Sequence, residues 1–164
     1  MLISVDLGYG YTKALTDKQR VIIPSVIAPA QDTSLDFYGS YEHVVEFSRP
    51  GETQVRRFFV GEAAIKSGRA AQVSLMRDKF GQKIAMVLAL TAAYLLGGEK
   101  QVKIVTGLPI VYYKNKALRN EVKLQLHKIV NYTVSVDGKP SRLITFSDIV
   151  IAPQGLGALF ALDK

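Results

Sequence analysis

The side chains best suited to chemistry gather near the N-terminus, in the stretch Asp6-Leu-Gly-Tyr-Gly-Tyr-Thr-Lys13. Gly8 and Gly10 allow backbone angles that other residues resist, and without side chains they let a ligand approach the main chain. A tight turn of this kind can aim several N–H groups at a phosphate, and Lys13 can add a positive charge. Asp6 could hold a hydrated divalent cation through its water shell. The stretch therefore predicts a phosphate-binding turn.

The flanking residues predict that this turn joins two strands. Leu2–Val5 is apolar and rich in β-branched residues, as in a buried strand, and Tyr11–Thr16 has the pattern of a returning strand. An ordinary β-hairpin has the same pattern, so a purely structural hairpin is the alternative. The glycine spacing matches neither a P-loop nor the Gly-x-Gly-x-x-Gly dinucleotide motif, because position 13 is Lys. The predicted second strand argues against a helix dipole as the phosphate holder.

The composition indicates a folded globular protein with enough residues for a core. The chain has 164 residues, of which 48% are hydrophobic and 21% charged. It has no cysteine, which excludes disulfides and thiolate metal sites, and its two histidines lie far apart in segments of different pattern, which argues against a histidine metal site. The formal net charge of +7 favours anionic partners such as nucleotides, nucleic acid or acidic protein surfaces. Because the basic residues are scattered, we expect no direct binding of nucleic acid.

No stretch of the sequence has the features of a secretion signal or a membrane anchor. The start, Met-Leu-Ile-Ser-Val-Asp, lacks a basic region followed by a long apolar run. The longest apolar stretch, Ile84–Leu96, is too short to span a bilayer. We therefore expect a cytoplasmic location and no membrane partner.

The first part of the chain predicts a β-meander and an inserted hairpin. Val21–Ile27 is a third predicted strand, and three sequential strands with short connections form an antiparallel meander. Pro24 should lie near a strand end or at an edge, because it cannot donate to a ladder. Two loosely alternating runs, Phe37–Phe47 and Val55–Val60, predict a hairpin. We interpret residues 32–60 as a small inserted β-rich subdomain.

Helices and strands alternate in the remainder of the chain. The predicted elements are a short helix over Gly61–Gly68, a long helix ending at Gly97-Gly98, a strand over Val102–Thr106, an exit loop at Gly107-Leu-Pro109, a helix over Asn115–Val130, a hairpin joining Tyr132–Val136 to Leu143–Ile151, and a loop entering an apolar helix over Ala152–Lys164. Asp78 is the predicted N-cap of the long helix, most of which should be buried. The helix over Asn115–Val130 carries an apolar stripe of Leu118, Val122, Leu126 and Ile129. This order is typical of a mixed α/β layer fold with a site at strand ends.

With these elements in place, the chain resembles the first half of the actin-like ATPases, and most of all the ParM/StbA-type actins of bacteria and archaea. The resemblance rests on five segments in the same order, namely Asp6–Lys13, Ile23–Ser25, Val60–Ala64, Val105–Ile110 and Ala152–Ala158. They look like the family's first phosphate loop, the two segments that follow it, the strand–Gly-Leu-Pro–helix passage and the helix start with the water-positioning residue. The resemblance implies an α/β, ribonuclease H-like domain, with a mixed five-stranded-type sheet flanked by helices.

The resemblance also implies roles for individual residues. Asp6 would bind the water shell of the Mg²⁺ that accompanies ATP or GTP. The nucleotide phosphates would be wrapped by the loop that consists of Gly8, Tyr9, Gly10, Tyr11, Thr12 and Lys13. Gln154 would orient the attacking water, and its structural alternative is a polar residue at a helix start. Because conventional actins carry serine where this chain has Tyr9, a main-chain contact would replace that hydroxyl contact.

The resemblance covers residues 1–164 as a first lobe, without the second lobe that supplies another phosphate loop and the adenosine pocket. Without the second lobe the nucleotide phosphates stay open to water, so we do not expect this piece to hydrolyse nucleotide by itself. The family implies ATP-driven self-association into filaments, with an adaptor protein that links them to DNA during plasmid segregation. A non-hydrolysing actin-fold scaffold and a sugar or acetate kinase of the same superfamily are the alternatives.

Overall fold

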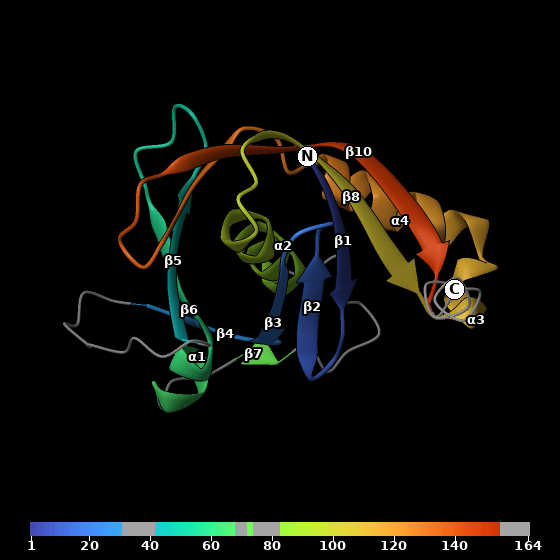
Figure 1. The fold of residues 1–164 in the computed structure, drawn as a ribbon, viewed down its shortest axis with the longest axis horizontal. Helices are drawn as coiled ribbons and strands as arrows, with labels where there is room; N and C mark the ends of the chain where they lie inside the picture. Colours follow the sequence, from blue (N-terminus) through green and yellow to red (C-terminus); the bar gives the residue numbers. More distant parts are fainter. Residues whose placement is uncertain (31–41, 68–71, 74–82, 155–164) are drawn as a thin grey trace.

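The structure, a computed structural model, describes residues 1–30, 42–67, 72–73 and 83–154 (Figure 1). The elements within these ranges are β1 (Leu2–Leu7), β2 (Tyr11–Leu15), β3 (Arg20–Pro24), β4 (Val26–Pro29), β5 (Glu42–Ser48), β6 (Arg56–Gly61), α1 (Glu62–Lys66), β7 (Gln72–Val73), α2 (Lys83–Leu95), β8 (Lys100–Leu108), α3 (Ile110–Tyr113), α4 (Lys116–His127), β9 (Tyr132–Val136) and β10 (Arg142–Pro153). Three parts of the predictions lie outside the described residues: the start of the inserted subdomain, the Asp78 cap and the helix after Gln154.

The predicted meander is confirmed, but its third strand is shorter than expected. β1 pairs antiparallel with β2, and β2 with β3. The single strand predicted over Val21–Ile27 is wrong, because the chain breaks at Ser25 into β3 and β4. Pro24 ends β3, as expected of a residue that cannot donate to the ladder. After Ser25 the chain leaves β2, and β4 pairs with β6 and β7.

The sheet is mixed, as predicted, but larger than the expected five-stranded type. Within the described residues it contains ten strands in the order β3-β2-β1-β8-β10-β9-β5-β6-β4-β7. The strands β1, β8 and β10 are parallel, and the other pairs are antiparallel. The extension arises because β5 pairs with β9, for example Val45 opposite Val136, which joins the predicted hairpin to the main sheet. The sheet curves, so that β5 and β6 face β1 and β2 across α2 (Figure 1).

Helix α2 forms the centre of the core, as its apolar sequence predicted. Most of its residues are buried, including Ile84, Leu88 and Ala92, and they belong to one core cluster with alternate residues of β1 and β8. The helix ends before Gly97, whose φ of 82° lies in the left-handed region. Helix α4 adds Val122 and Leu126 to the same core.

The ends of several predicted elements are corrected by the structure. Helix α4 stops at His127 rather than Val130, yet Ile129 stays buried and its carbonyl accepts a hydrogen bond from Phe146 N at 2.9 Å. Gly107 and Leu108 belong to β8 rather than to a loop, because they pair with β10. β10 likewise continues to Pro153, with a register shift between Phe146 and Asp148. None of the helices in the described ranges is long and apolar enough to cross a membrane.

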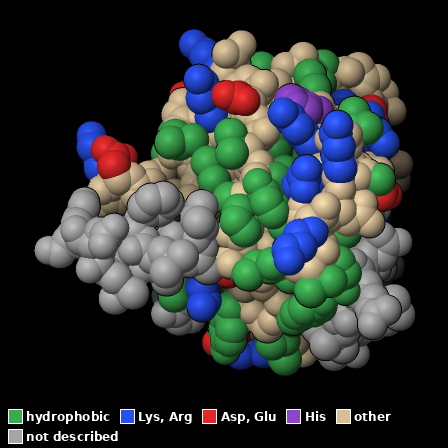
Figure 2. Space-filling view, turned by 90° about the vertical axis from the view of Figure 1, so that its right-hand side faces the viewer, with side chains coloured by type: hydrophobic (Ala, Val, Ile, Leu, Met, Phe, Trp, Pro, Cys, Tyr) green, Lys and Arg blue, Asp and Glu red, His purple; other side chains and the backbone are tan. Residues whose placement is uncertain are grey.

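The second face of β2, β1, β8 and β10 is partly apolar and exposed. Leu15 lies opposite Ser4, Ser4 opposite Val105, and Val105 opposite Val150, so these residues form a row across four strands. Leu15 is 52% and Val150 is 50% exposed. Figure 2 shows hydrophobic side chains gathered on the side of the molecule where β10 and α4 run in Figure 1, beside a group of Lys and Arg side chains.

Candidate functional site

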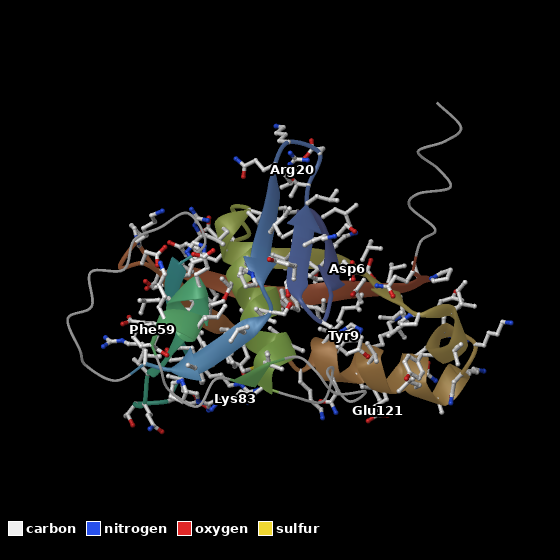
Figure 3. The ribbon with its side chains drawn as sticks, turned by 90° about the horizontal axis from the view of Figure 1, so that it is seen from below. Asp6, Tyr9, Arg20, Phe59, Lys83 and Glu121 are labelled. Carbon is white, nitrogen blue, oxygen red and sulfur yellow. The ribbon has the colours of Figure 1, made fainter. Side chains whose placement is uncertain are left out.

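The site is built at the edge of the sheet where β1 turns into β2. Asp6 near the end of β1 lies opposite Lys13 on β2, so both side chains leave the same face of the sheet. Asp6 is half-buried and Lys13 is exposed. Figure 3 shows Asp6 and Tyr9 close to the tip of this hairpin. A carboxylate and an ammonium group therefore flank a short, exposed turn.

Gln154 reaches this edge from the far end of the described chain. Since β1, β8 and β10 are parallel neighbours, their carboxyl ends lie side by side. Gln154 follows β10, and its backbone N donates to Leu108 O at 2.7 Å. Its side-chain Nε2 donates to Asp6 Oδ1 at 3.1 Å, across 148 positions of sequence. The structure thus brings together Asp6, Lys13 and Gln154, three residues that the sequence singled out.

The two glycines of the turn differ from each other, and the predicted need for unusual backbone angles is wrong for both. Neither Gly8 nor Gly10 has a φ in the left-handed region. At Gly8, a Cβ would lie 2.4 Å from Tyr11 O, which is too close for any other residue. At Gly10, a Cβ would meet nothing within 4 Å, so the position is open to an approaching ligand. The close approach of Tyr11 O explains Gly8, whereas nothing in the packing around Gly10 requires a glycine there.

The remaining loop residues divide between the two faces of β2. Tyr9 and Tyr11 are 43% and 55% exposed, and Tyr11 shares the face of Lys13. Thr12 is fully buried on the opposite face, where its Oγ1 lies 3.0 Å from Ser25 Oγ. The side chain of Thr12 therefore does not reach the face that carries Asp6 and Lys13. The sequence analysis gave Ser25 no role beyond its place in the segment Ile23–Ser25, although a polar residue inside the apolar run Ile22–Ile27 was a signal.

The carboxylate at the site suits a hydrated cation rather than one enclosed by protein. Within the described ranges, no group of three or more His, Asp or Glu residues could hold a metal ion, and Asp6 forms no ion pair there. Mg²⁺ typically keeps several waters and binds through one or two carboxylates together with phosphate oxygens. Asp6 beside an open turn and a lysine fits that arrangement.

Comparisons with known proteins agree with this architecture. Residues 4–157 match the family model described as "Actin like proteins N terminal domain". The solved structure of the pCBH ParM non-polymerisable quadruple mutant is 31% identical, with a TM-score of 0.79 over 97% of this chain and 48% of that one. Ta0583, an archaeal actin homolog in complex with ADP, is 24% identical, with a TM-score of 0.72 over 99% of this chain and 47% of that one. The Alp12 filament structure is 19% identical, with a TM-score of 0.66 over 97% of this chain and 48% of that one.

The chain spans about half the length of these solved proteins. No curated protein matches it. The family model covers residues 4–157, which is nearly the whole chain. The chain therefore belongs to the actin-like proteins and corresponds to their N-terminal domain.

Proposed function

We propose that this chain is the nucleotide-binding N-terminal lobe of a filament-forming actin-like ATPase of the plasmid-segregation type. The single observation that carries the proposal is the contact of Gln154 Nε2 with Asp6 Oδ1 at 3.1 Å, beside the open turn at Gly10. It places a carboxylate, a carboxamide and exposed main chain at one edge of the sheet. An archaeal homologue of the same fold, Ta0583, was solved with ADP, which supports a nucleotide as the ligand.

Each residue would contribute in a different way to ATP hydrolysis. The main chain of Gly8, Tyr9 and Gly10 would bind the phosphates, and Lys13 would neutralise part of their charge. Asp6 would hold the water shell of Mg²⁺, which, when bound, offsets the charge on the phosphate oxygens. Gln154 can both donate and accept hydrogen bonds, as a residue that orients the attacking water for in-line displacement must.

The other parts of this proposal concern assembly. Two solved relatives, a non-polymerisable ParM mutant and an Alp12 filament, support self-association as the activity that nucleotide binding controls. An adaptor protein would connect such a filament to DNA. Because this chain spans half the length of those proteins, we expect a second lobe to complete the nucleotide site, and we expect the isolated lobe to hydrolyse ATP poorly.

The test is calorimetric titration of the folded chain with Mg²⁺-ATP and, separately, with Mg²⁺-GTP. We expect weak binding of one nucleotide, and at least about a tenfold loss of affinity in Asp6→Asn, because one charged contact is worth roughly 1.4 kcal/mol or more. Asp148→Asn is the matched control, since this exposed carboxylate lies on β10 near Lys103, away from Gln154.

Two results would contradict the proposal. If the folded wild-type chain binds neither nucleotide, it is not a self-sufficient nucleotide site, and the proposal fails for this chain by itself. If Asp6→Asn and Asp148→Asn bind as well as the wild type, nucleotide binds elsewhere on the chain. Phosphoryl transfer to a sugar or acetate in the same assay would instead indicate a kinase of the superfamily.

A further inference from the structure

A pair of buried hydroxyl groups lies directly beneath the phosphate-binding turn. Ser25 Oγ donates to the carbonyl oxygen of Gly8 at 2.8 Å, and Ser25 N donates to the carbonyl oxygen of Gly10 at 2.9 Å. One serine therefore holds both ends of the Gly8–Gly10 segment. Ser25 has no exposed surface, so both of its donor groups are shielded from water.

Thr12 holds the side chain of Ser25 through a second hydrogen bond. Its Oγ1 lies 3.0 Å from Ser25 Oγ, and Thr12 also has no exposed surface. A serine hydroxyl has one proton, and Ser25 uses that proton toward Gly8 O. Thr12 must therefore be the donor to Ser25 Oγ. The result is a directional chain of hydrogen bonds from Thr12 to Ser25 to the backbone of Gly8.

We propose that Thr12 and Ser25 are positioning residues that hold the Gly8–Gly10 turn in its anion-binding shape. This inference rests on the proposed function, since it assigns support for the same turn. The carbonyl and the N–H of a trans peptide unit point in opposite directions, so holding the Gly8 carbonyl inward also sets the direction of the Tyr9 N–H. A buried pair that sets backbone orientation before the ligand arrives lowers the cost of binding it.

The position of Ser25 explains why it can do this. It occupies the break between β3 and β4, where the chain leaves β2 and crosses to the other part of the sheet. Because Ser25 belongs to neither strand, its side chain can point back beneath the hairpin of β1 and β2. The neighbouring Pro24 cannot donate a backbone hydrogen bond, which ends the β2–β3 ladder next to the serine.

The experiment compares four variants of the whole chain by two measurements. Ser25→Ala removes the donor to Gly8, and Thr12→Val removes the donor to Ser25 with little change of shape. Thr12→Ser keeps that hydroxyl. Ser135→Ala is the matched control, because Ser135 Oγ also donates a 2.8 Å hydrogen bond to a carbonyl, that of Lys139. Thermal unfolding identifies variants that no longer fold.

The first measurement is amide hydrogen exchange of the segment from Leu7 to Tyr11 without any ligand. We expect exchange roughly five- to tenfold faster in Ser25→Ala, and a smaller increase in Thr12→Val, because each loses a buried hydrogen bond next to the turn. Thr12→Ser and Ser135→Ala should exchange there as the wild type does. Unchanged exchange in both Ser25→Ala and Thr12→Val would overturn the proposal, whatever the nucleotide result.

The second measurement is the affinity for Mg²⁺-ATP. We expect Ser25→Ala to bind at least about fivefold more weakly, since the turn must be ordered on binding. Ser135→Ala should bind as the wild type does, and an equal loss in Ser135→Ala would overturn a positioning role. If the wild type binds no nucleotide, the proposed function fails for this chain, and the exchange measurement by itself decides whether the pair holds the turn.

Discussion

Gly8 and Gly10 lie two positions apart, yet only one of them has no room for a side chain. At Gly8 the obstacle is the carbonyl oxygen of Tyr11, which is backbone and cannot rotate away. At Gly10 a Cβ would meet nothing within 4 Å, and φ lies outside the left-handed region. Packing therefore requires the glycine at position 8, whereas the glycine at position 10 leaves room for a ligand.

The first prediction tests this difference between the two glycines. We expect Gly8→Ala to lower the free energy of unfolding by roughly 1–3 kcal/mol, as overpacking against backbone does. Gly10→Ala should leave it unchanged, or raise it by up to about 1 kcal/mol through a less flexible unfolded chain. Urea denaturation followed by circular dichroism measures both. Equal losses of unfolding free energy in the two variants would show that the close contact with Tyr11 O does not explain why position 8 is glycine.

The second prediction concerns the pair of Gln154 and Asp6. In Gln154→Glu two carboxylates would face each other at hydrogen-bond distance, so we expect a lower midpoint of thermal unfolding in buffer with EDTA. The cost should stay below about 1 kcal/mol, because Gln154 is exposed. Millimolar Mg²⁺ should restore the midpoint by binding both carboxylates.

Gln154→Ala is the matched control for that measurement, because it removes the amide without adding charge. Its midpoint of unfolding should be the same with EDTA and with Mg²⁺. A Gln154→Glu protein that is equally insensitive to Mg²⁺ would mean that the two side chains do not stay together in solution.

At the scale of elements, helix α4 illustrates a boundary set by one side chain. Asn115 precedes the helix, and its side chain accepts a hydrogen bond from Leu118 N at 3.1 Å. Only Val122 and Leu126 of this helix are fully buried, and most of its remaining surface is polar and exposed. With so few buried contacts, the cap should contribute a visible share of the helix's stability.

The third prediction tests this cap. Asn115→Ala should lower the free energy of unfolding by about 1 kcal/mol, since it leaves an amide at the helix start without its acceptor. Asn120→Ala, at an exposed position inside the same helix, should leave the free energy unchanged or raise it, because alanine is the better helix former. Chemical denaturation of both variants provides the comparison. A larger loss at position 120 than at position 115 would exclude capping as the explanation.

At the scale of the whole molecule, one face of β2, β1, β8 and β10 carries exposed apolar side chains beside polar ones. The row from Leu15 across Ser4 and Val105 to Val150 runs over β2, β1, β8 and β10. Exposed apolar side chains that gather on one face favour association in water, whereas scattered exposed apolar residues do not. Asp6 and Lys13 lie on the same face, so the candidate site borders this surface.

The fourth prediction concerns the apolar side chains of this row. Val150→Lys should reduce association of the chain at high concentration, as measured by sedimentation velocity, with a change of less than about 0.5 kcal/mol in the free energy of unfolding. Val55→Lys is the matched control, because Val55 is 56% exposed but stands before β6 rather than in the apolar row. An equal effect of both substitutions would attribute association to net charge instead of to the sheet face.

The features that the sequence predicted correctly depend on neighbours in the chain. The apolar, β-branched run Leu2–Val5, the strand pattern of Tyr11–Thr16, the apolar pattern that ends at Gly97-Gly98 and the short motifs around Asp6 and Val105 are local signals. Each can be recognised from a few consecutive residues. Their order along the chain was sufficient to indicate the actin-like family, which the comparison with the family model confirms.

What only the tertiary structure decided involves residues far apart in sequence. The division of one apolar run at Ser25 depends on β4 pairing with β6, and the ten-stranded sheet depends on β5 pairing with β9. Local propensity carries no information about such partners, since strand pairing is determined by packing against distant segments. The contact between Gln154 and Asp6 likewise exists because β1, β8 and β10 run parallel. The sequence named both residues, and their meeting at one edge of the sheet is a property of the fold.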